Sequence, residues 1–251
     1  NIVWSSIIGL MLLYLSIGYY IGGRLADRVP SLPYFFSLIC LAATTTSLIP
    51  IVSRPILLYA ATALASLDAP VVVGAFAGVM LIFAIPITLL GCTSPFAIRI
   101  LTTRMSEAGS VAGRVYALST LGSILGSFLP VLVTIPLIGT RYTYILFSGA
   151  LLLTSLIGLL KYSTRKQSQN TPYLILVFLV ATYLCSEGNI RPIDGLIYEK
   201  ESAYNLIQVV ERNGTHYLLL NEGQGIHSVY NPTGQYTGGS LDYFLSIPYF
   251  N

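Results

Sequence analysis

A carboxylate lies between two guanidiniums in the segment GRLADR, where Asp27 follows Arg24 and directly precedes Arg28. Charges at this spacing can pair across the ends of neighbouring helices. Gly23 opens the segment, and we expect a tight turn in a loop after an apolar run. Two interpretations stay open: a loop with a role in transport, and a basic loop with one acid that only orients the chain in a membrane.

The cysteines and histidines form no recognisable site in the sequence. Cys40, Cys92 and Cys185 lie far apart in or beside apolar segments, a pattern that gives neither a disulfide framework nor a metal motif. His216 and His227 have no cysteine or carboxylate constellation around them, and we interpret both as strand residues. We therefore expect no metal site and no catalytic residue in these 251 residues.

Composition indicates a multi-span membrane protein. Apolar residues make up 54% of the chain and charged residues 9%, and the mean hydropathy is +0.73. Residues 1–186 carry 10 basic and 3 acidic side chains, a net charge of +7, whereas residues 187–251 carry 3 and 7, a net charge of −4. The overall charge of +3 therefore averages two unlike parts, and we expect no nucleic-acid partner.

Apolar runs of about 20 residues can cross the roughly 30 Å hydrocarbon core of a bilayer. Six runs are candidates, the last of them short: Ile2–Gly22, Leu32–Val52, Pro70–Leu90, Val115–Pro136, Tyr142–Leu160 and Pro172–Cys185. The run Ile56–Leu67 is too short to span, and we expect an interfacial or re-entrant helix there. We predict an α-helical polytopic bundle of about six transmembrane helices in residues 1–186.

Small residues recur four apart within the predicted helices. The pairs are Gly18/Gly22, Gly74/Gly78 and Gly122/Gly126. This spacing lets two helix backbones approach closely, so we expect tight packing at these pairs. A substrate path lined by glycine, serine and proline is the alternative, but the predicted spans hold no charged residue, which argues against a half-transporter for polyamines.

The loops carry an uneven distribution of basic residues. The side on which the first run ends receives Arg24, Arg28, Arg99, Arg104, Arg114, Lys161, Arg165 and Lys166. The other side receives Arg54 and Arg141, so the positive-inside rule makes the first side cytoplasmic. We therefore expect a multi-pass protein in a lipid bilayer, and we expect this bilayer to be a bacterial inner membrane. If the sixth run spans, residues 187–251 lie outside the cytoplasm.

Residues 187–239 have the pattern of a small antiparallel β domain. The runs NLIQVVER and THYLLLNE flank Asn213-Gly214, and this pair tolerates the positive φ angles of a type I′ hairpin turn. The run Gln224–Tyr230 offers a third strand, and Ser240 can cap a helix that begins in residues 240–251. Such a small sheet has a marginal core, so we expect it to dock on the bundle, another subunit or a further domain.

Two segments carry a resemblance to a known family. YEKESAYNLIQVVERNGTHYLLLNEGQGIHSVY together with LDYFLSIPYF resembles the N-terminal β domain and linker helix of the spermidine synthase family, in the bacterial branch fused to a facilitator-like membrane domain. GRVYALSTLGSILGSFLPVLVTIPLIGTRYT is similar to the membrane part of those fusions. GRLADR is also similar to the loop motif of the major facilitator superfamily, with Pro30 where that motif has glycine.

The resemblance implies a co-substrate and three binding residues. Tyr204, followed by Asn205, stands where the family has a Tyr-Gln pair, and Gln224 matches a glutamine that holds the nucleoside of the aminopropyl donor, decarboxylated S-adenosylmethionine. Asp242 stands near the positions that contact the polyamine. The catalytic Rossmann domain would follow Phe250, so we expect these residues alone to be non-catalytic and to hold no cofactor.

Three functions remain in view. The first is an aminopropyltransferase homologue, and the second is a non-enzymatic membrane scaffold or accessory subunit that binds a partner through the β domain. The third, a half-transporter for polyamines, is the least favoured because the predicted spans lack acids. In each case we expect a homo-oligomer or a larger membrane complex.

Overall fold

The computed structural model describes residues 2–65, 71–163, 171–186, 193–202, 204–221, 225–234 and 242–243. The chain falls into two compact units. The first comprises Asn1–Ser127 and Arg141–Ser186, and the second comprises Phe128–Thr140 and Glu187–Asn251. The two units are treated separately below.

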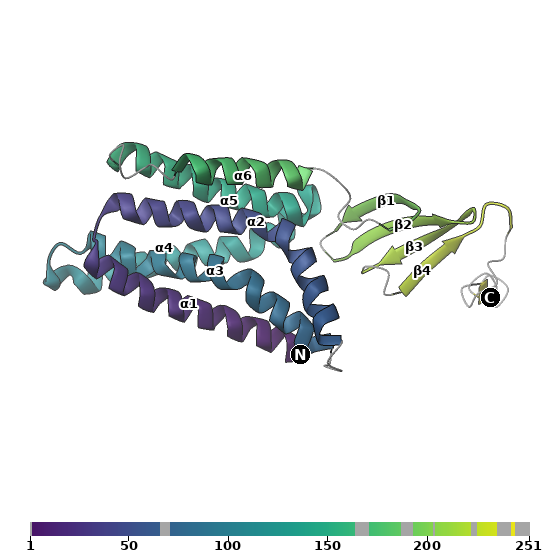
Figure 1. Ribbon diagram of the computed structural model, residues 1–251, viewed down its shortest axis with the longest axis horizontal. Coiled ribbons are helices and arrows are strands. Elements are labelled where there is room, and N and C mark those ends of the chain that lie inside the picture. The colour runs from purple at the N-terminus through teal and green to yellow at the C-terminus, as the bar shows by residue number, and fades with distance from the viewer. Residues whose placement is uncertain are drawn as a thin grey trace, which may run out of the picture. The chain divides into compact units, whose positions relative to one another are not determined.

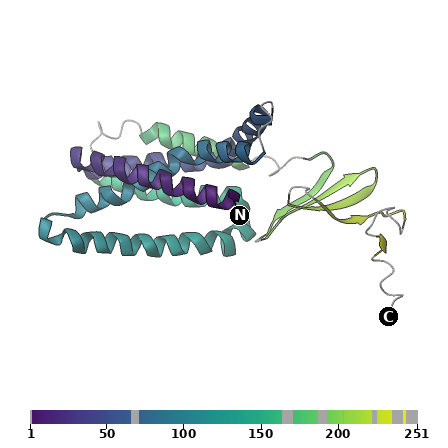
Figure 2. The same cartoon turned by 90° about the horizontal axis from the view of Figure 1, so that it is seen from below.

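Helices make up the first unit (Figure 1). They are α1 (Ile2–Arg28), α2 (Leu32–Ala65), α3 (Val71–Leu101), α4 (Ala108–Leu129), α5 (Ile135–Tyr162) and α6 (Thr171–Ser186), with a short 3-10 turn at Met105–Glu107 and a π-helical turn at Pro130–Thr134. Helix α3 packs against both α1 and α2, and α2 also packs against α6. Figure 2 shows α4 running along one edge of the helical unit.

Four helical stretches among the described residues are long and apolar enough to cross a membrane. They are Ile7–Arg28, Leu32–Ala60, Phe76–Leu101 and Met105–Tyr162. The last contains two helices, because Gly139 has non-helical backbone angles and interrupts α5. Helix α6 is shorter. The chain is therefore mostly helical, with a small antiparallel sheet after the helices, and the long apolar helices are compatible with a membrane protein.

The helix predicted at Ile56–Leu67 is confirmed as far as Ala65, the last described residue there, and it forms the second half of α2. Its interfacial or re-entrant position stays a prediction. Helix α2 continues through Pro50 and Pro55 to Ala65, and Figure 1 shows that it changes direction in its second half. Each proline removes one backbone donor and bends the helix without ending it. The hydroxyl of Ser53 donates to the carbonyl oxygen of Pro50 at 3.3 Å and so contributes a hydrogen bond near the bend.

The predicted close packing at Gly18 and Gly22 is confirmed. A Cβ on Gly18 would clash with the carbonyl oxygen of Thr88 and lie 2.9 Å from the Cα of Gly91, and a Cβ on Gly22 would lie 2.5 Å from the Cα of Cys92. The backbones of α1 and α3 are therefore in direct contact, which only residues without a side chain permit.

The third small-residue pair behaves differently. No heavy atom of the described structure lies within 4 Å of the Cβ position of Gly122 or Gly126, so the predicted packing there is wrong. The reason is that α4 has no buried residue and its small residues meet no neighbouring backbone. Of the pair Gly74/Gly78, Gly78 shows the predicted close packing, because its missing side chain leaves room for the side chain of Leu57.

A core joins α2, α5 and α6. It is built on Cys40, Ala43, Leu152 and Leu159, with Phe36 and Phe178 packed against it. Buried hydroxyls in this part of the unit bond to their own helix: Thr44 donates to the carbonyl oxygen of Cys40 at 2.9 Å, and Ser155 to that of Leu152 at 2.7 Å. These bonds let polar residues lie in an apolar core without unsatisfied groups.

The second unit contains a four-stranded antiparallel sheet in the order β1-β2-β3-β4 (Figure 1). The strands are β1 (Leu196–Glu201), β2 (Leu206–Arg212), β3 (Thr215–Leu220) and β4 (Gly225–Tyr230). The predicted hairpin is confirmed, because Asn213 and Gly214 join β2 to β3 with φ angles of 52° and 76°. The predicted third strand is β4.

One strand of this unit was not predicted, and the predicted linker helix is described only in part. Strand β1 was not predicted, because its sequence LIYEKE carries three charges and lacks a clear apolar alternation. Of the predicted linker helix in residues 240–251, the structure describes only Asp242 and Tyr243, which form a short helical turn. The remainder of that prediction lies outside the described residues.

We predict that Gly22→Ala destabilises the protein and that Gly23→Ala does not. The methyl group at position 22 would overlap Cys92, whereas nothing lies within 4 Å of the Cβ position of Gly23. Overpacking of this kind costs about 1–3 kcal/mol, and alanine in an open helical position gains up to about 1 kcal/mol. Thermal unfolding of the purified protein in detergent measures both. Equal midpoints for the two variants would contradict the close contact between α1 and α3.

Candidate functional site

The segment GRLADR is helical, so the predicted tight turn is wrong. Helix α1 includes Gly23 and continues to Arg28, and the amide of Val29 still donates to the carbonyl oxygen of Leu25 at 2.9 Å. The helix ends only near Pro30, whose ring disfavours helical angles in the preceding residue. The motif therefore forms the last turns of α1.

Asp27 pairs with a neighbouring helix, as its charge allows. Its Oδ1 lies 3.1 Å from the Nε of Arg99 in the last turn of α3. The guanidinium of Arg24 lies over the ring of Tyr20, 4.4 Å from its centroid. The side chain of Asp27 is 73% exposed and that of Arg99 is 49% exposed. The pair therefore contributes little stability, of order 1 kcal/mol or less. It shows that the last turns of α1 and α3 lie side by side.

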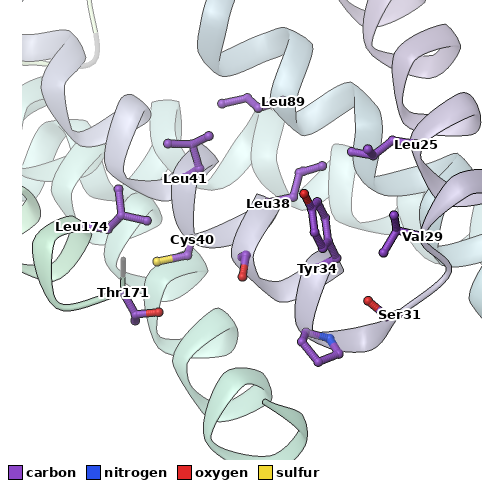
Figure 3. A pocket seen from close by; sticks show the side chains of 12 residues that line it. Leu25, Val29, Ser31, Tyr34, Leu38, Cys40, Leu41, Leu89, Thr171 and Leu174 are labelled. Carbon is purple, nitrogen blue, oxygen red and sulfur yellow. The ribbon is translucent and has the colours of Figure 1, made fainter. Parts of the chain in front are cut away.

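A cavity of about 600 Å³ lies at the same end of the helical unit. Helices α1, α2, α3 and α6 and the α1–α2 connection contribute its walls (Figure 3). The lining residues are Leu25, Val29, Ser31, Pro33, Tyr34, Ser37, Leu38, Cys40, Leu41, Leu89, Thr171 and Leu174. Aliphatic side chains dominate, and the polar groups are hydroxyls and a thiol. Among the described lining residues there is no aspartate, glutamate, lysine, arginine or histidine, so these walls suit an apolar molecule.

The residues implied by the family resemblance lie on separate segments of the second unit. Tyr204 stands in the turn between β1 and β2 and is 91% exposed. Asp242 is half-buried in the short helical turn near the end of the chain. Gln224 lies outside the described residues.

Sequence reasoning missed a buried polar pair in the sheet. Gln208 on β2 is fully buried, and its Nε2 donates to the Oε1 of Glu199 at 2.7 Å. The two residues stand directly opposite each other on neighbouring strands. Since a buried amide needs a partner, Glu199 fixes the register of β1 against β2. The sequence did not predict strand β1, and without that strand nothing indicates that Glu199 lies opposite Gln208.

A second carboxylate on β1 binds the segment 128–140 of the same unit. Glu201 accepts hydrogen bonds from both the amide and the hydroxyl of Thr140, the latter at 2.8 Å. Thr140 follows the break at Gly139, where φ is +79°. A Cβ at that position would lie 3.0 Å from the Oε2 of Glu201. Gly139 thus serves both the backbone angle and the close approach of the carboxylate.

The Glu201 carboxylate caps the amide of Thr140, directly after the break at Gly139. Free amides at a helix N-terminus favour a negative charge, and here the carboxylate comes from a strand far away in the sequence. The sequence signal for this contact is the pair Gly139-Thr140 between the apolar runs Val115–Pro136 and Tyr142–Leu160. That pair indicates a break and a cap but does not identify the partner.

Comparison with known proteins gives no match to any family, curated protein or solved structure. Among the described residues, no group of three histidines, cysteines or acids is placed to hold a metal ion. The function of this chain is therefore inferred from its own geometry and charges.

We predict that Glu201→Ala opens the start of the helix at Thr140. Hydrogen bonds to a charged group contribute about 1.5–3 kcal/mol, so amides of residues 140–143 should exchange with deuterium about tenfold faster or more. Hydrogen exchange followed by mass spectrometry measures this. Glu211→Ala is the matched control on β2. Its side chain is 51% exposed, and its Oε2 lies 4.0 Å from the Nε2 of His216, which is too far for a hydrogen bond. Unchanged exchange in Glu201→Ala would contradict the capping contact.

Proposed function

We propose that this chain is the membrane bundle and front β domain of a spermidine-synthase-like protein. The supporting observation is the order of its parts: apolar helices first, then an antiparallel sheet whose central hairpin turns at Asn213-Gly214. That order is the one implied by the resemblance to membrane-fused members of the family. In this proposal the membrane helices anchor the sheet, and aminopropyl transfer takes place on a Rossmann domain.

The charges of the second part suit the proposed substrates. Residues 187–251 carry 3 basic and 7 acidic side chains, a net charge of −4. Decarboxylated S-adenosylmethionine and polyamines are cations, and a negative surface raises their local concentration. The exposed ring of Tyr204 is free to stack on the nucleoside, and the carboxylate of Asp242 suits an ammonium group.

The reaction itself would transfer an aminopropyl group from a sulfonium to an amine. The nitrogen of the acceptor attacks the carbon next to the sulfonium, the carbon–sulfur bond breaks, and methylthioadenosine leaves with the electron pair. A base must take the proton of the attacking amine. The described residues of this chain contribute binding groups to that scheme, and the base belongs to the Rossmann domain.

A non-enzymatic scaffold is the second candidate, and the loop charges favour it. Eight basic residues on one side against two on the other place residues 187–251 outside the cytoplasm if α6 spans. The aminopropyl donor is made in the cytosol, so a sheet outside would serve partner binding more readily than synthesis.

We predict that the full-length protein binds methylthioadenosine and that Tyr204→Ala weakens this binding about tenfold. Stacking of a base on an aromatic ring contributes about 1–3 kcal/mol. Isothermal titration of the purified protein measures the affinity. Tyr230→Ala is the matched control, because Tyr230 is an exposed tyrosine on β4 of the same sheet. Absence of binding, or the same loss in both variants, would remove the proposed role of Tyr204.

The scaffold alternative also predicts the side of the membrane on which the sheet lies. Ser228→Cys on β4 should react with an impermeant thiol reagent in intact cells, whereas Ser106→Cys in the basic connection between α3 and α4 should not. Both serines are exposed, and the native cysteines are buried. Protection of both new cysteines would put the sheet in the cytoplasm and remove the external scaffold.

A further inference from the structure

We propose that the cavity at the end of α1 binds one acyl chain of an anionic phospholipid from the cytoplasmic leaflet. This inference rests on the membrane location in the proposed function, but not on aminopropyl transfer. Three features of the molecule support it: the polarity of the cavity walls, the size of the cavity, and the charges at the ends of the helices.

The cavity walls change from polar to apolar along its length. Figure 3 shows Ser31 and Thr171 at one end and Leu41 and Leu89 at the other, with the ring of Tyr34 between them. Ser31 belongs to the connection between α1 and α2, and Thr171 is the first residue of α6. The hydroxyl end therefore lies at the level of the helix ends, and the aliphatic end lies deeper in the helical unit. An amphipathic molecule fits this arrangement, with its chain inside and its polar part outside.

An acyl chain is the occupant that the surroundings supply. The volume of about 600 Å³ falls within the range of roughly 300–1,000 Å³ found for binding pockets. An empty cavity with leucine walls loses dispersion contacts. In a bilayer the neighbouring apolar molecules are lipid chains, so a chain restores these contacts without any hydrophobic driving force.

Arg28 stands next to the hydroxyl end, and Lys161 lies in the last turn of α5. Arg28 ends α1 between Leu25 and Val29, and both of these line the cavity. Lys161 precedes Tyr162. The ring of Tyr162 stacks on Phe36 of α2 at a centroid distance of 6.1 Å. Phe36 immediately precedes Ser37, another lining residue.

The acids at this end are already engaged by other cations. Asp27 pairs with Arg99 at 3.1 Å, and Glu107 lies 4.0 Å from Arg104. Among the described residues, Arg28 and Lys161 have no acidic partner. A phosphate carried by a lipid chain in the cavity would supply one, and basic pockets between helices on the cytoplasmic side are suited to anionic headgroups.

Purification of the protein with its lipids tests the proposal. The protein would be placed in nanodiscs that contain equal amounts of phosphatidylglycerol and phosphatidylcholine, and native mass spectrometry would then count the lipids that it retains. We expect one retained phosphatidylglycerol per chain. Ser37→Phe fills the cavity and should lower this retained lipid about tenfold. Ser123→Phe is the matched control, because Ser123 lies exposed on α4, away from the cavity. Size-exclusion profiles confirm that both variants are folded.

A second pair of variants tests the headgroup. Arg28→Gln together with Lys161→Gln should remove the preference for phosphatidylglycerol, whereas Arg54→Gln, on the opposite loop side, should leave it unchanged. Equal retention of both lipids by the wild-type protein, or full retention by folded Ser37→Phe, would overturn the proposal. Extraction of the protein from membranes by alkaline carbonate would instead overturn the membrane location itself, so the two failures are distinguishable.

Discussion

Direct contact between the backbones of α1 and α3 is the constraint on which the helical unit depends. Gly18 and Gly22 bring α1 onto Gly91 and Cys92 of α3, and a single methyl group at either glycine would separate the two helices. The contact brings the ends of both helices together, so Asp27 meets Arg99. It also holds Leu25 and Val29 in the wall of the cavity. The ion pair and the cavity thus follow from two residues that have no side chains.

Strand β1 has a comparable role in the second unit. Glu199 accepts a hydrogen bond from the buried side-chain nitrogen of Gln208, and two positions later Glu201 binds Thr140. The alternation of a strand sends every second side chain to the same face, so two carboxylates spaced in this way lie on one face. One carboxylate fixes the register of the sheet, and the other binds the segment that follows the π-helical turn. The second unit therefore includes residues 128–140 as well as the sheet.

Local sequence signals predicted the features that local chemistry determines. Asn213-Gly214 predicted the hairpin because few residues tolerate its positive φ angles, and long apolar runs predicted the helices. The same reasoning failed where the outcome depends on distant residues. The runs Leu32–Val52 and Ile56–Leu67 stood apart in the sequence, yet one helix, α2, extends through Pro50 and Pro55 from Leu32 to Ala65. Gly23 suggested a turn, yet its helix ends only before Pro30. Strand β1 and the partner of Thr140 are fixed by long-range contacts, and their charged sequence gave no local sign of them.

The central claim is that this chain is part of a membrane-anchored aminopropyltransferase, and product release tests it most directly. The protein as its gene encodes it in full would be placed in nanodiscs with decarboxylated S-adenosylmethionine and putrescine, and methylthioadenosine would be followed over time. The account predicts release that requires both substrates and exceeds that of empty nanodiscs. Absence of release by folded protein would contradict the enzymatic account and favour the scaffold.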